Sequence, residues 1–321
     1  MEVSKTKICI IIPYFGKLPT TVDLWLKSCE WNPNINFLVY SDVKKENVPD
    51  NVLWITEPFE KFKTMAKSKL DMEIKLDTPY ECCDFKAVYG IIFEDYLCGY
   101  DYWGFCDMDM IFGDLEWFFK KYNLELYDKF HAWGHLTLFR NTKENNNRFR
   151  LPCTEGMGYK NAFITGGSTH FCEHEINQIY HMYGFPFFDQ RICADITPAC
   201  KRMKIGGKGT NYDQQVFFWQ NGKVWRAYLA KTKTWKGIEV EEFAYIHFQK
   251  RKMVPPSFDV KKVNRFYIAS DGFPEKKEIS YPSLEKINEI NPYRGLVFEK
   301  CEYLQFQMKR LQRRVKMRHK G

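Results

Sequence analysis

The chain has 321 residues, and its hydrophobic content of 45% is enough for a sizeable core in one large domain or two smaller ones. It contains no run of 18 apolar residues, which argues against a membrane-spanning helix, and its eleven cysteines include no Cys-x-x-Cys pair of a zinc knuckle. The formal net charge is +8, but residues 301–321 carry seven Lys or Arg and one Glu, so the rest of the chain is nearly balanced. Because residues 1–7 show no signal-peptide pattern, we expect reduced thiols in a cytoplasmic protein.

The first third of the chain predicts an α/β sheet of the nucleotide-binding kind. Three short apolar runs are typical of buried parallel strands, and a helix is expected between the first two. The strands are expected at residues 7–12, 36–40 and 52–55, and the helix at 20–29, with Thr20 or Thr21 as its N-cap. The first strand stops at the sequence PYFG, and Asp42 follows the second. This opening lacks both the Gly-x-Gly-x-x-Gly fingerprint and the Gly-Lys-Ser/Thr phosphate loop.

A charged, weakly helical segment over residues 57–78 precedes a second helix. That helix is expected from Cys83 to about Tyr96, with Asp84 as its N-cap. Asp84 and Lys86 near its start could face the ribose and phosphate of a nucleotide. The alternative is a helix cap beside a solvated lysine, and position alone favours that alternative.

The most informative stretch is GYDYWGFCDMDMIFGDL, residues 99–115. Its aromatic part, residues 102–106, predicts a buried strand that ends at about Asp107, because aspartate is a poor strand former. Asp107 and Asp109 are two residues apart, and two close carboxylates repel each other unless a cation lies between them. Ligands of α/β sheets bind at the carboxyl ends of strands, so the pair predicts a Mg²⁺ or Mn²⁺ site that also binds substrate phosphates. The alternative is an ordinary solvated turn, but the apolar flanks on both sides argue against it.

The middle of the chain alternates predicted elements with less legible segments. We expect helices at residues 116–127 and 176–183, a pair of strands at 129–140, and a polar loop at 141–150. His170 and His174 have the spacing of two ligands on one helix face, but without a third ligand this pattern is a weak indication of a metal.

Four candidate residues follow between positions 213 and 251. Asp213 is expected near the amino end of a helix over residues 212–218, where an acid is often only a cap. His247 ends an apolar strand over residues 243–248, after another at 225–229, and is followed by Lys250 and Arg251. A histidine at a strand end beside basic residues suits a third metal ligand next to diphosphate-binding cations. A packed strand histidine is the alternative.

The chain ends in a proline-broken segment and a final helix. In this helix Tyr303, Phe306, Leu311 and Val315 alternate with basic residues. A basic amphipathic helix can lie on an anionic membrane surface, bind nucleic acid or pack on the body of the protein.

Taken together, these residues resemble the GT-A glycosyltransferases of bacterial capsule and exopolysaccharide synthesis. The resemblance rests on Ile12-Pro13-Tyr14-Phe15, Asp42, Cys83-Asp84-Phe85-Lys86, Asp107-Met108-Asp109, Asp213-Gln214 and His247-Phe248. The order Asp84, Lys86, Asp107 and Asp109 is similar to the Ser-Asp-x-x-Arg … Asp-x-Asp arrangement of capsule and mannosyl-type transferases. The chain departs from it in two places, since Cys83 stands in place of serine and Lys86 lies one position before the arginine.

The resemblance implies an α/β enzyme with a Rossmann-like sheet that transfers a hexose from a nucleoside diphosphate sugar, UDP above all. The acceptor would be a hydroxyl of a glycan or a lipid-linked oligosaccharide in surface polysaccharide synthesis. The implied ligands of Mn²⁺ or Mg²⁺ are Asp107, Asp109 and His247. The implied donor-binding residues are Pro13, Tyr14, Phe15, Asp42, Asp84, Lys86, Asp107 and Lys250. Asp213 would be the general base if the reaction inverts, and would only orient the sugar if it retains.

Residues 1–252 would then form the GT-A domain, with a nucleotide-binding half at about 1–115 and an acceptor half at about 116–252. Residues 253–321 would be a helical extension that ends in the basic amphipathic helix, which could place the protein on the inner face of the membrane. One alternative is a metal-dependent nucleotidyltransferase, which would want a glycine-rich phosphate loop after the first strand. The other is a nucleic-acid-binding protein that uses the basic tail, but the near-neutral body argues against a nucleic-acid partner.

Overall fold

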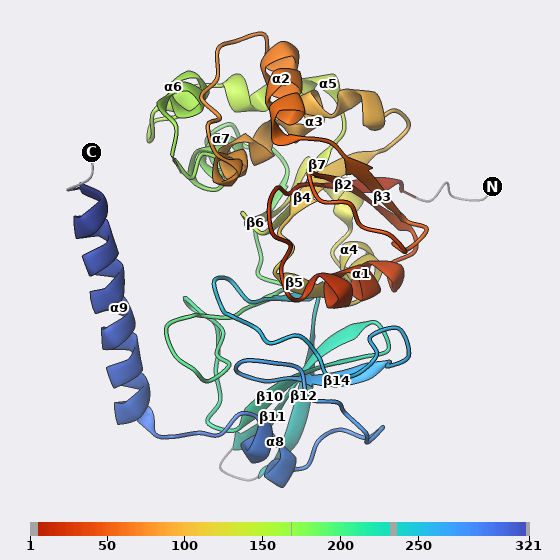
Figure 1. Cartoon of the computed structure of the whole chain (residues 1–321), viewed down its shortest axis with the longest axis vertical. Coiled ribbons are helices and arrows are strands. Elements are labelled where there is room, and N and C mark those ends of the chain that lie inside the picture. The colour runs from red at the N-terminus through yellow and green to blue at the C-terminus, as the bar shows by residue number, and fades with distance from the viewer. Residues whose placement is uncertain (1–5, 168, 232–235, 319–321) are drawn as a thin grey trace. The chain divides into compact units, whose positions relative to one another are not determined.

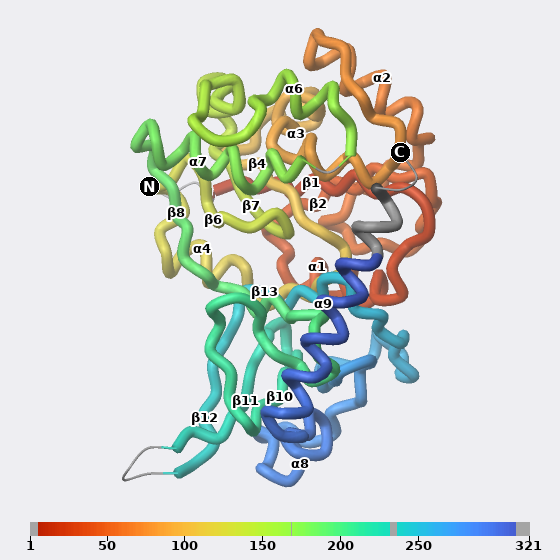
Figure 2. The backbone as a smooth tube through the Cα atoms, turned by 90° about the vertical axis from the view of Figure 1, so that its left-hand side faces the viewer, coloured from red at the N-terminus to blue at the C-terminus, as the bar shows by residue number. Residues whose placement is uncertain are grey.

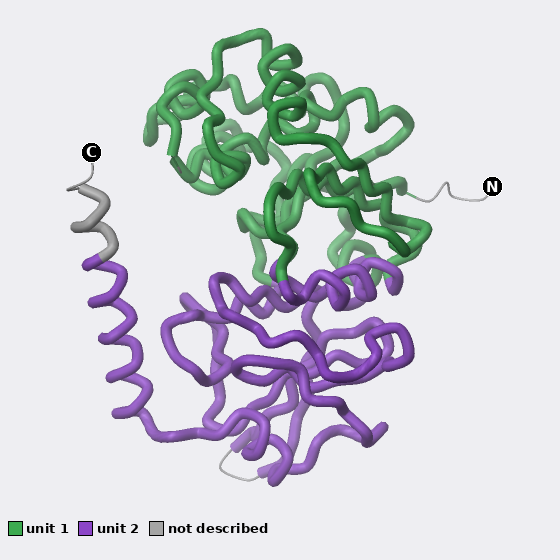
Figure 3. Tube along the Cα trace, in the orientation of Figure 1, with its two compact units in different colours: residues 1–19, 32–108, 116–191 green, residues 20–31, 109–115, 192–321 purple. Residues whose placement is uncertain are grey.

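The computed structural model describes residues 6–318 except 168 and 232–235, and side chains as far as residue 312 (Figure 1). The described chain divides into two compact units that interleave along the sequence (Figure 3). The first comprises residues 1–19, 32–108 and 116–191, and the second comprises residues 20–31, 109–115 and 192–321. The division into a nucleotide half and an acceptor half concerns function, and it stays a prediction.

The first unit contains, in the described residues, a seven-stranded sheet in which β3, β2, β1 and β4 run parallel to one another. β7 is antiparallel to both of its neighbours, β4 and β6, and β8 is parallel to β6. In spatial order the strands are β3 (Val52–Thr56), β2 (Ile35–Ser41), β1 (Ile8–Pro13), β4 (Tyr102–Cys106), β7 (Leu136–Arg140), β6 (Lys129–Trp133) and β8 (Phe187–Phe188). The predicted early strands, the strand that ends just before Asp107 and the strand pair at 129–140 are confirmed.

Helices flank this sheet and supply much of its core. Phe62 of α2, Phe85 of η1 and Phe163 of α6 are fully buried with the strand residues Tyr40 and Phe105 in one hydrophobic cluster. The helical segments are α2 (Phe59–Leu70), η1 (Pro79–Val88), α3 (Tyr89–Ile92), η2 (Glu94–Tyr96), α4 (Leu115–Lys121), η3 (Leu124–Leu126), α5 (Lys143–Asn147), η4 (Arg148–Arg150), α6 (Gly158–Thr165) and α7 (His174–Met182). The unit is therefore a mixed α/β fold around a parallel-rich sheet.

Two local predictions in this unit are wrong. The single helix expected from Cys83 is instead a 3-10 helix that begins at Pro79 and is followed by the short α3 and η2. Its N-cap is Thr78, which forms a reciprocal capping box with Glu81, so Asp84 lies inside the helix and is not a cap. The polar loop expected at 141–150 contains α5, because the Thr142 side chain caps a short helix by accepting an N–H bond.

The second unit contains, within the described ranges, two smaller sheets. One is antiparallel, with the order β12 (Lys236–Phe243), β11 (Lys223–Lys231), β10 (Gln215–Gln220) and β14 (Arg265–Ile268). The other has the order β5 (Met110–Phe112), β13 (Tyr245–His247) and β9 (Ala194–Asp195). The path of the chain through β10, β11, β12 and β13 can be followed in Figure 2. The helices are α1 (Val22–Glu30), α8 (Leu284–Ile290) and α9 (Leu296–Arg318). The buried Trp25 of α1 packs near Phe112 of β5, with 6.3 Å between ring centroids.

The helix expected at residues 212–218 is wrong, because β10 occupies most of that range. Val216 and Phe218 face one hydrophobic cluster, and Phe217 and Trp219 face another, so the strand is buried on both sides. A strand buried on both faces has a continuous apolar sequence, which cannot be told from a buried helix by its period. The segment 253–321, expected to be helical, also contributes β14 to this sheet.

Two further expectations, reduced cysteines and the lack of a membrane-spanning helix, concern the chain as a whole. All eleven cysteines lie in the described part of the chain, and none of them is in a disulfide bond. Among the described residues, the helices are too short or too polar to span a bilayer.

Candidate functional site

The strand order of the first unit changes direction at β1. After β1 the chain forms β2 and β3 on one side of that strand, whereas β4 pairs with its other side. In the β1–β4 pair Ile8 lies opposite Tyr102. Because β1 and β4 are parallel, the segments after Pro13 and after Cys106 leave the same edge of the sheet. Ligands of open α/β sheets bind at the carboxyl ends of the strands at such a switch point. This edge is the nucleotide-binding candidate of the first unit.

The loop after β1 is held at this edge by β2 and by Asp42. The N–H of Tyr14 donates to the carbonyl of Tyr40 at 2.9 Å, and the N–H of Gly16 donates to Asp42 Oδ1 at 2.7 Å. Gly16 has a φ of +87°, a backbone conformation that glycine adopts much more readily than other residues. Phe15 is buried in the core and anchors the loop. The structure thus brings the predicted Tyr14, Phe15 and Asp42 together, and their contacts with a base or ribose stay predictions.

Lys86 pairs with Asp107 and is not a solvated lysine. Its ammonium lies 2.5 Å from Asp107 Oδ1 and 2.7 Å from the carbonyl oxygen of Gly134. Burial opposes the charge on Lys86, but the attraction and hydrogen bond of Asp107 outweigh it, so the pKa of the ammonium is raised. A fixed positive charge therefore lies beside the first aspartate of the Asp-x-Asp motif.

Asp84 has a structural partner that the sequence did not indicate. Its buried carboxylate accepts the N–H groups of Thr169, at 2.9 Å, and of His170, at 3.0 Å. Two charge-assisted bonds to backbone N–H groups hold the segment that leads into α7. His170 precedes that helix, so it does not share a helix face with His174, in keeping with the weak indication of a metal that this pair gave in the sequence.

Glu81 makes a similar bond set one turn earlier. It accepts the N–H groups of Asp77 at 2.6 Å, Thr78 at 2.9 Å and Gly167 at 2.8 Å. Burial raises the pKa of this carboxyl, but the three N–H donors lower it further, and the net direction is downward. Glu81 is therefore an ionised clamp between η1 and the glycine-rich segment.

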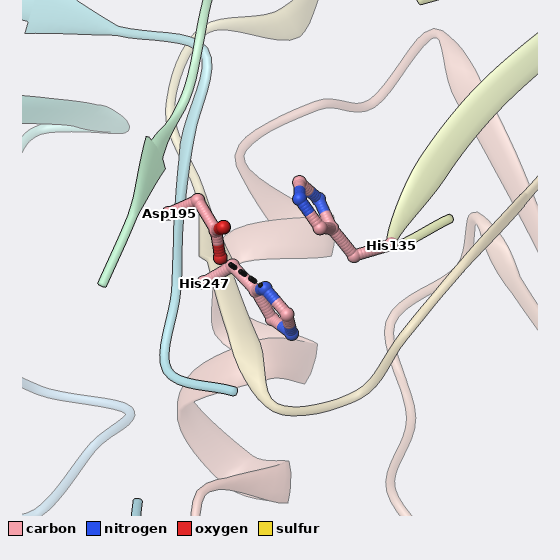
Figure 4. Close-up of side chains that lie close together, drawn as sticks. All are labelled: His135, Asp195 and His247. Atoms are coloured by element: carbon pink, nitrogen blue, oxygen red, sulfur yellow. Dashed lines mark hydrogen bonds and ion pairs between the residues drawn. The ribbon is translucent and has the colours of Figure 1, made fainter. Parts of the chain in front are cut away.

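The second unit contains the His247 site, which consists of His247, Asp109 and Asp195. His247 ends β13, where it lies opposite Met110 of β5 and opposite Asp195 of β9. Its Nδ1 lies 2.8 Å from Asp195 Oδ1 (Figure 4). Its Nε2 lies 3.3 Å from Asp109 Oδ1. The imidazole is thus held between two carboxylates, with only 7% of the residue exposed. His135, also drawn in Figure 4, belongs to the first unit.

Backbone and side-chain bonds fix the His247 site. The N–H of Phe248 donates to the carbonyl of Asp109 at 2.9 Å, and Gln249 Nε2 donates to Asp195 Oδ1 at 3.0 Å. Asp195 therefore accepts from two donors and defines the ring orientation of His247. A carboxylate on one ring nitrogen is the usual support of a histidine that binds a metal through the other nitrogen.

The residues of the His247 site fit a divalent ion. Asp109 offers carboxylate oxygens, which suit Mg²⁺ and Mn²⁺, and the imidazole suits a transition metal such as Mn²⁺. The predicted neighbours Asp109 and His247 are brought together in the second unit. Asp107, two residues earlier in the chain, belongs to the first unit, where it pairs with Lys86.

The remaining predicted site residues have different environments. Asp213 is exposed on the bend before β10, and its backbone carbonyl accepts a bond from Arg202 at 2.8 Å. Lys250 is exposed after β13. Arg251 donates to backbone carbonyls such as those of Thr197, at 2.9 Å, and Ser270, at 3.0 Å. Its guanidinium therefore supports the fold, so of the two basic candidates Lys250 has the exposed charge.

The comparisons with known proteins identify a family but no activity. A family model described as a family of unknown function (DUF6625) matches residues 10–277. The chain belongs to the DUF6625 family. No protein of curated function matches its sequence.

Among solved structures, this DUF6625 chain is similar to the crystal structure of the glycosyltransferase GlyE of Streptococcus pneumoniae TIGR4. The identity is 10% and the TM-score 0.32, over 58% of this chain and 45% of that chain, so the match spans less than half of GlyE. The proposed function therefore rests on the residues of the chain and not on this similarity.

Two residues of this DUF6625 chain were missed in the sequence. Asp195 interrupts the apolar run of residues 192–196, and an acid inside a buried run needs a partner, which was a usable signal. Gln249 has no comparable signal, because its role depends on a contact across 54 residues of chain.

Proposed function

We propose that this chain is a metal-dependent glycosyltransferase. It would move a hexose from a nucleoside diphosphate sugar, most simply a UDP-hexose, to a hydroxyl of a glycan or lipid-linked acceptor in surface polysaccharide synthesis. The observation that carries the proposal is the His247 imidazole, which Asp195 orients through Nδ1 and which faces Asp109 through Nε2. Asp109 and His247 would be metal ligands, and Asp107, the next acid before Asp109 in the chain, would be the third.

The edge of the parallel sheet in the first unit supports nucleotide binding. The loop of Tyr14 and Phe15 and the carboxylate of Asp42 would frame the base and ribose at the end of β1, where the strand order changes direction. The buried positive charge of Lys86 would lie on the phosphate side, next to Asp107. Pro13 ends β1 at the start of this loop.

The chemistry follows from charge. A bound Mn²⁺ or Mg²⁺ would neutralise the charge that develops on the diphosphate leaving group. Lys250 would add a charge-assisted contact to the same group. Asp213 would accept the proton of the acceptor hydroxyl in an inverting reaction, or orient the donor sugar in a retaining one. Asp84 is bonded to backbone N–H groups, so its contribution to a donor site would be to position the segment after α6.

Two variants test the proposal. Asp109→Asn and His247→Gln should each lower the Mn²⁺-dependent affinity for UDP by about a hundredfold, because each removes a metal ligand. Glu289→Gln, at an exposed carboxylate of α8, is the matched control and should bind as the unmodified chain does. Circular dichroism checks that all three variants are folded. Tight, Mn²⁺-dependent UDP binding by folded Asp109→Asn would remove Asp109 from the site.

A further inference from the structure

α9 has one face that contacts its own unit. The carboxylate of Glu299 lies 2.8 Å from Arg202 Nη1 and 2.7 Å from Lys204 Nζ, and this glutamate is only 6% exposed. Glu302 accepts the N–H of Lys201 at 3.1 Å. These bonds fix the first turns of α9 and determine which face of the helix points away from Lys201, Arg202 and Lys204.

The other face of α9 is apolar and exposed. Its side chains recur at alternating intervals of four and three residues, which is the spacing of the a and d positions of a heptad repeat. These seam residues are Val297, Cys301, Leu304, Met308 and Leu311. Val297 is 77% exposed, Leu304 61%, Met308 62% and Leu311 64%, and Cys301 is also exposed. In the sequence Val315 continues the same spacing, although its side chain lies outside the described residues.

We propose that the seam binds the same seam of a second copy of this chain, so that two α9 helices form a short coiled coil. Leu296, Phe298 and Tyr303 are also exposed, but they lie in the first two turns of α9. Among the described residues beyond Tyr303, the exposed large apolar side chains are those at the a and d positions, and such a narrow stripe is the form of a coiled-coil seam. A helix that lies in a membrane surface has instead a broad apolar face. Repetition at 3.5 residues keeps such a stripe aligned with a partner helix over the length of α9.

The residues beside the seam make self-association feasible. In residues 297–312 the positions that flank it are Phe298, Lys300, Gln305, Gln307 and Gln312, and of these Lys300 alone is charged. When a helix meets its own copy, each flanking residue faces one from the same set, so like charges there would repel. Lys309 and Arg310 lie next to Met308 in sequence, but at heptad positions that point away from the seam.

The seam from Val297 to Leu311 covers about two heptads, fewer than the three to four of a sustained coiled coil. We therefore expect a reversible dimer whose population rises with protein concentration. This inference does not depend on the proposed function, because the seam contains none of the proposed site residues.

Sedimentation velocity of the full chain over a concentration series, with a reducing agent to prevent disulfides through Cys301, tests the proposal. The unmodified chain should show a monomer–dimer equilibrium. Leu304→Glu should weaken it by about a hundredfold, because the dimer loses two buried leucines, each worth roughly a tenfold factor. Tyr303→Glu adds the same charge at a neighbouring exposed residue outside the seam, and should leave the equilibrium within a few-fold.

Two outcomes would overturn the proposal. One is a monomer at every concentration, whether or not the chain binds vesicles that contain anionic phospholipid. Vesicle binding by that monomer would assign the seam to a membrane surface. The other is an equal loss of dimer in Leu304→Glu and Tyr303→Glu, which would show that charge matters and the seam does not.

Discussion

Replacing Asp195 should weaken Mn²⁺ binding at the His247 site without unfolding the protein. Asp195 Oδ1 accepts from His247 Nδ1 at 2.8 Å and from Gln249 Nε2 at 3.0 Å. In Asp195→Asn the amide oxygen can still accept both bonds, so the ring orientation and the fold are retained. The variant loses only the negative charge of residue 195, and charge-assisted hydrogen bonds are roughly twice as strong as neutral ones.

The expected magnitude follows from these bonds. Loss of the charge assistance is worth about 1–2 kcal/mol, which is about a tenfold loss of Mn²⁺ affinity. Asp195→Ala also removes the bond that orients the ring, and should approach the hundredfold loss typical of residues that support a metal-binding histidine. Asp195→Ala should therefore lose more Mn²⁺ affinity than Asp195→Asn.

Calorimetric titration of Mn²⁺ in the presence of UDP measures both losses, with Glu289→Gln as the surface control. Asp195 does not contact the metal in this account, so the stoichiometry should remain that of the unmodified chain. Unchanged Mn²⁺ affinity in both variants would refute the assignment of Asp195 as the residue that positions His247.

Two further predictions concern stability. Because the folded state lowers the pKa of Glu81, its ionised form stabilises the protein above the ordinary value of 4.5, and this contribution is lost as the pH falls through the lower, folded-state pKa. Glu81→Gln should therefore cost about 1–3 kcal/mol in urea unfolding at neutral pH, and this cost should shrink steadily as the pH falls below 4.5; a cost that does not change with pH would contradict the clamp. Gly90→Ala should cost about 1–3 kcal/mol, since a Cβ there would lie 2.3 Å from the Trp103 indole, whereas Gly272→Ala, with its nearest atom at 3.7 Å, should be within about 0.5 kcal/mol of the unmodified chain. Equal melting temperatures for the two glycine variants would count against the packing of α3 on β4.

The sequence predicted best those elements whose signals are local. The strand that ends before Asp107 was predictable because an aromatic run is followed at once by aspartates. β10 was not, because its residues are buried on both faces and its sequence has neither the strand nor the helix period. The cap of η1 was assigned to Asp84 although Thr78 and Glu81 form a capping box, which is a local pattern that sequence reading can recover.

Only those residues of the candidate site that have a local signal in the sequence were predicted. Asp109 and His247 have local signals, an acid after an apolar run and a histidine at a strand end, and the structure places them 3.3 Å apart. Their pairing requires β13 to lie beside β5, which are more than 130 residues apart in the chain. Asp195 enters through a two-residue strand, and so short an element has too few residues to show a period.

The most direct test of the central claim is a calorimetric titration of UDP, GDP and CDP into the full chain, first with Mn²⁺ and then with EDTA. Of the three nucleotides, UDP should bind in the presence of Mn²⁺, and EDTA should abolish its binding. If the folded protein binds none of the three under either condition, the claim is contradicted, and Asp107-Met108-Asp109 is an ordinary turn.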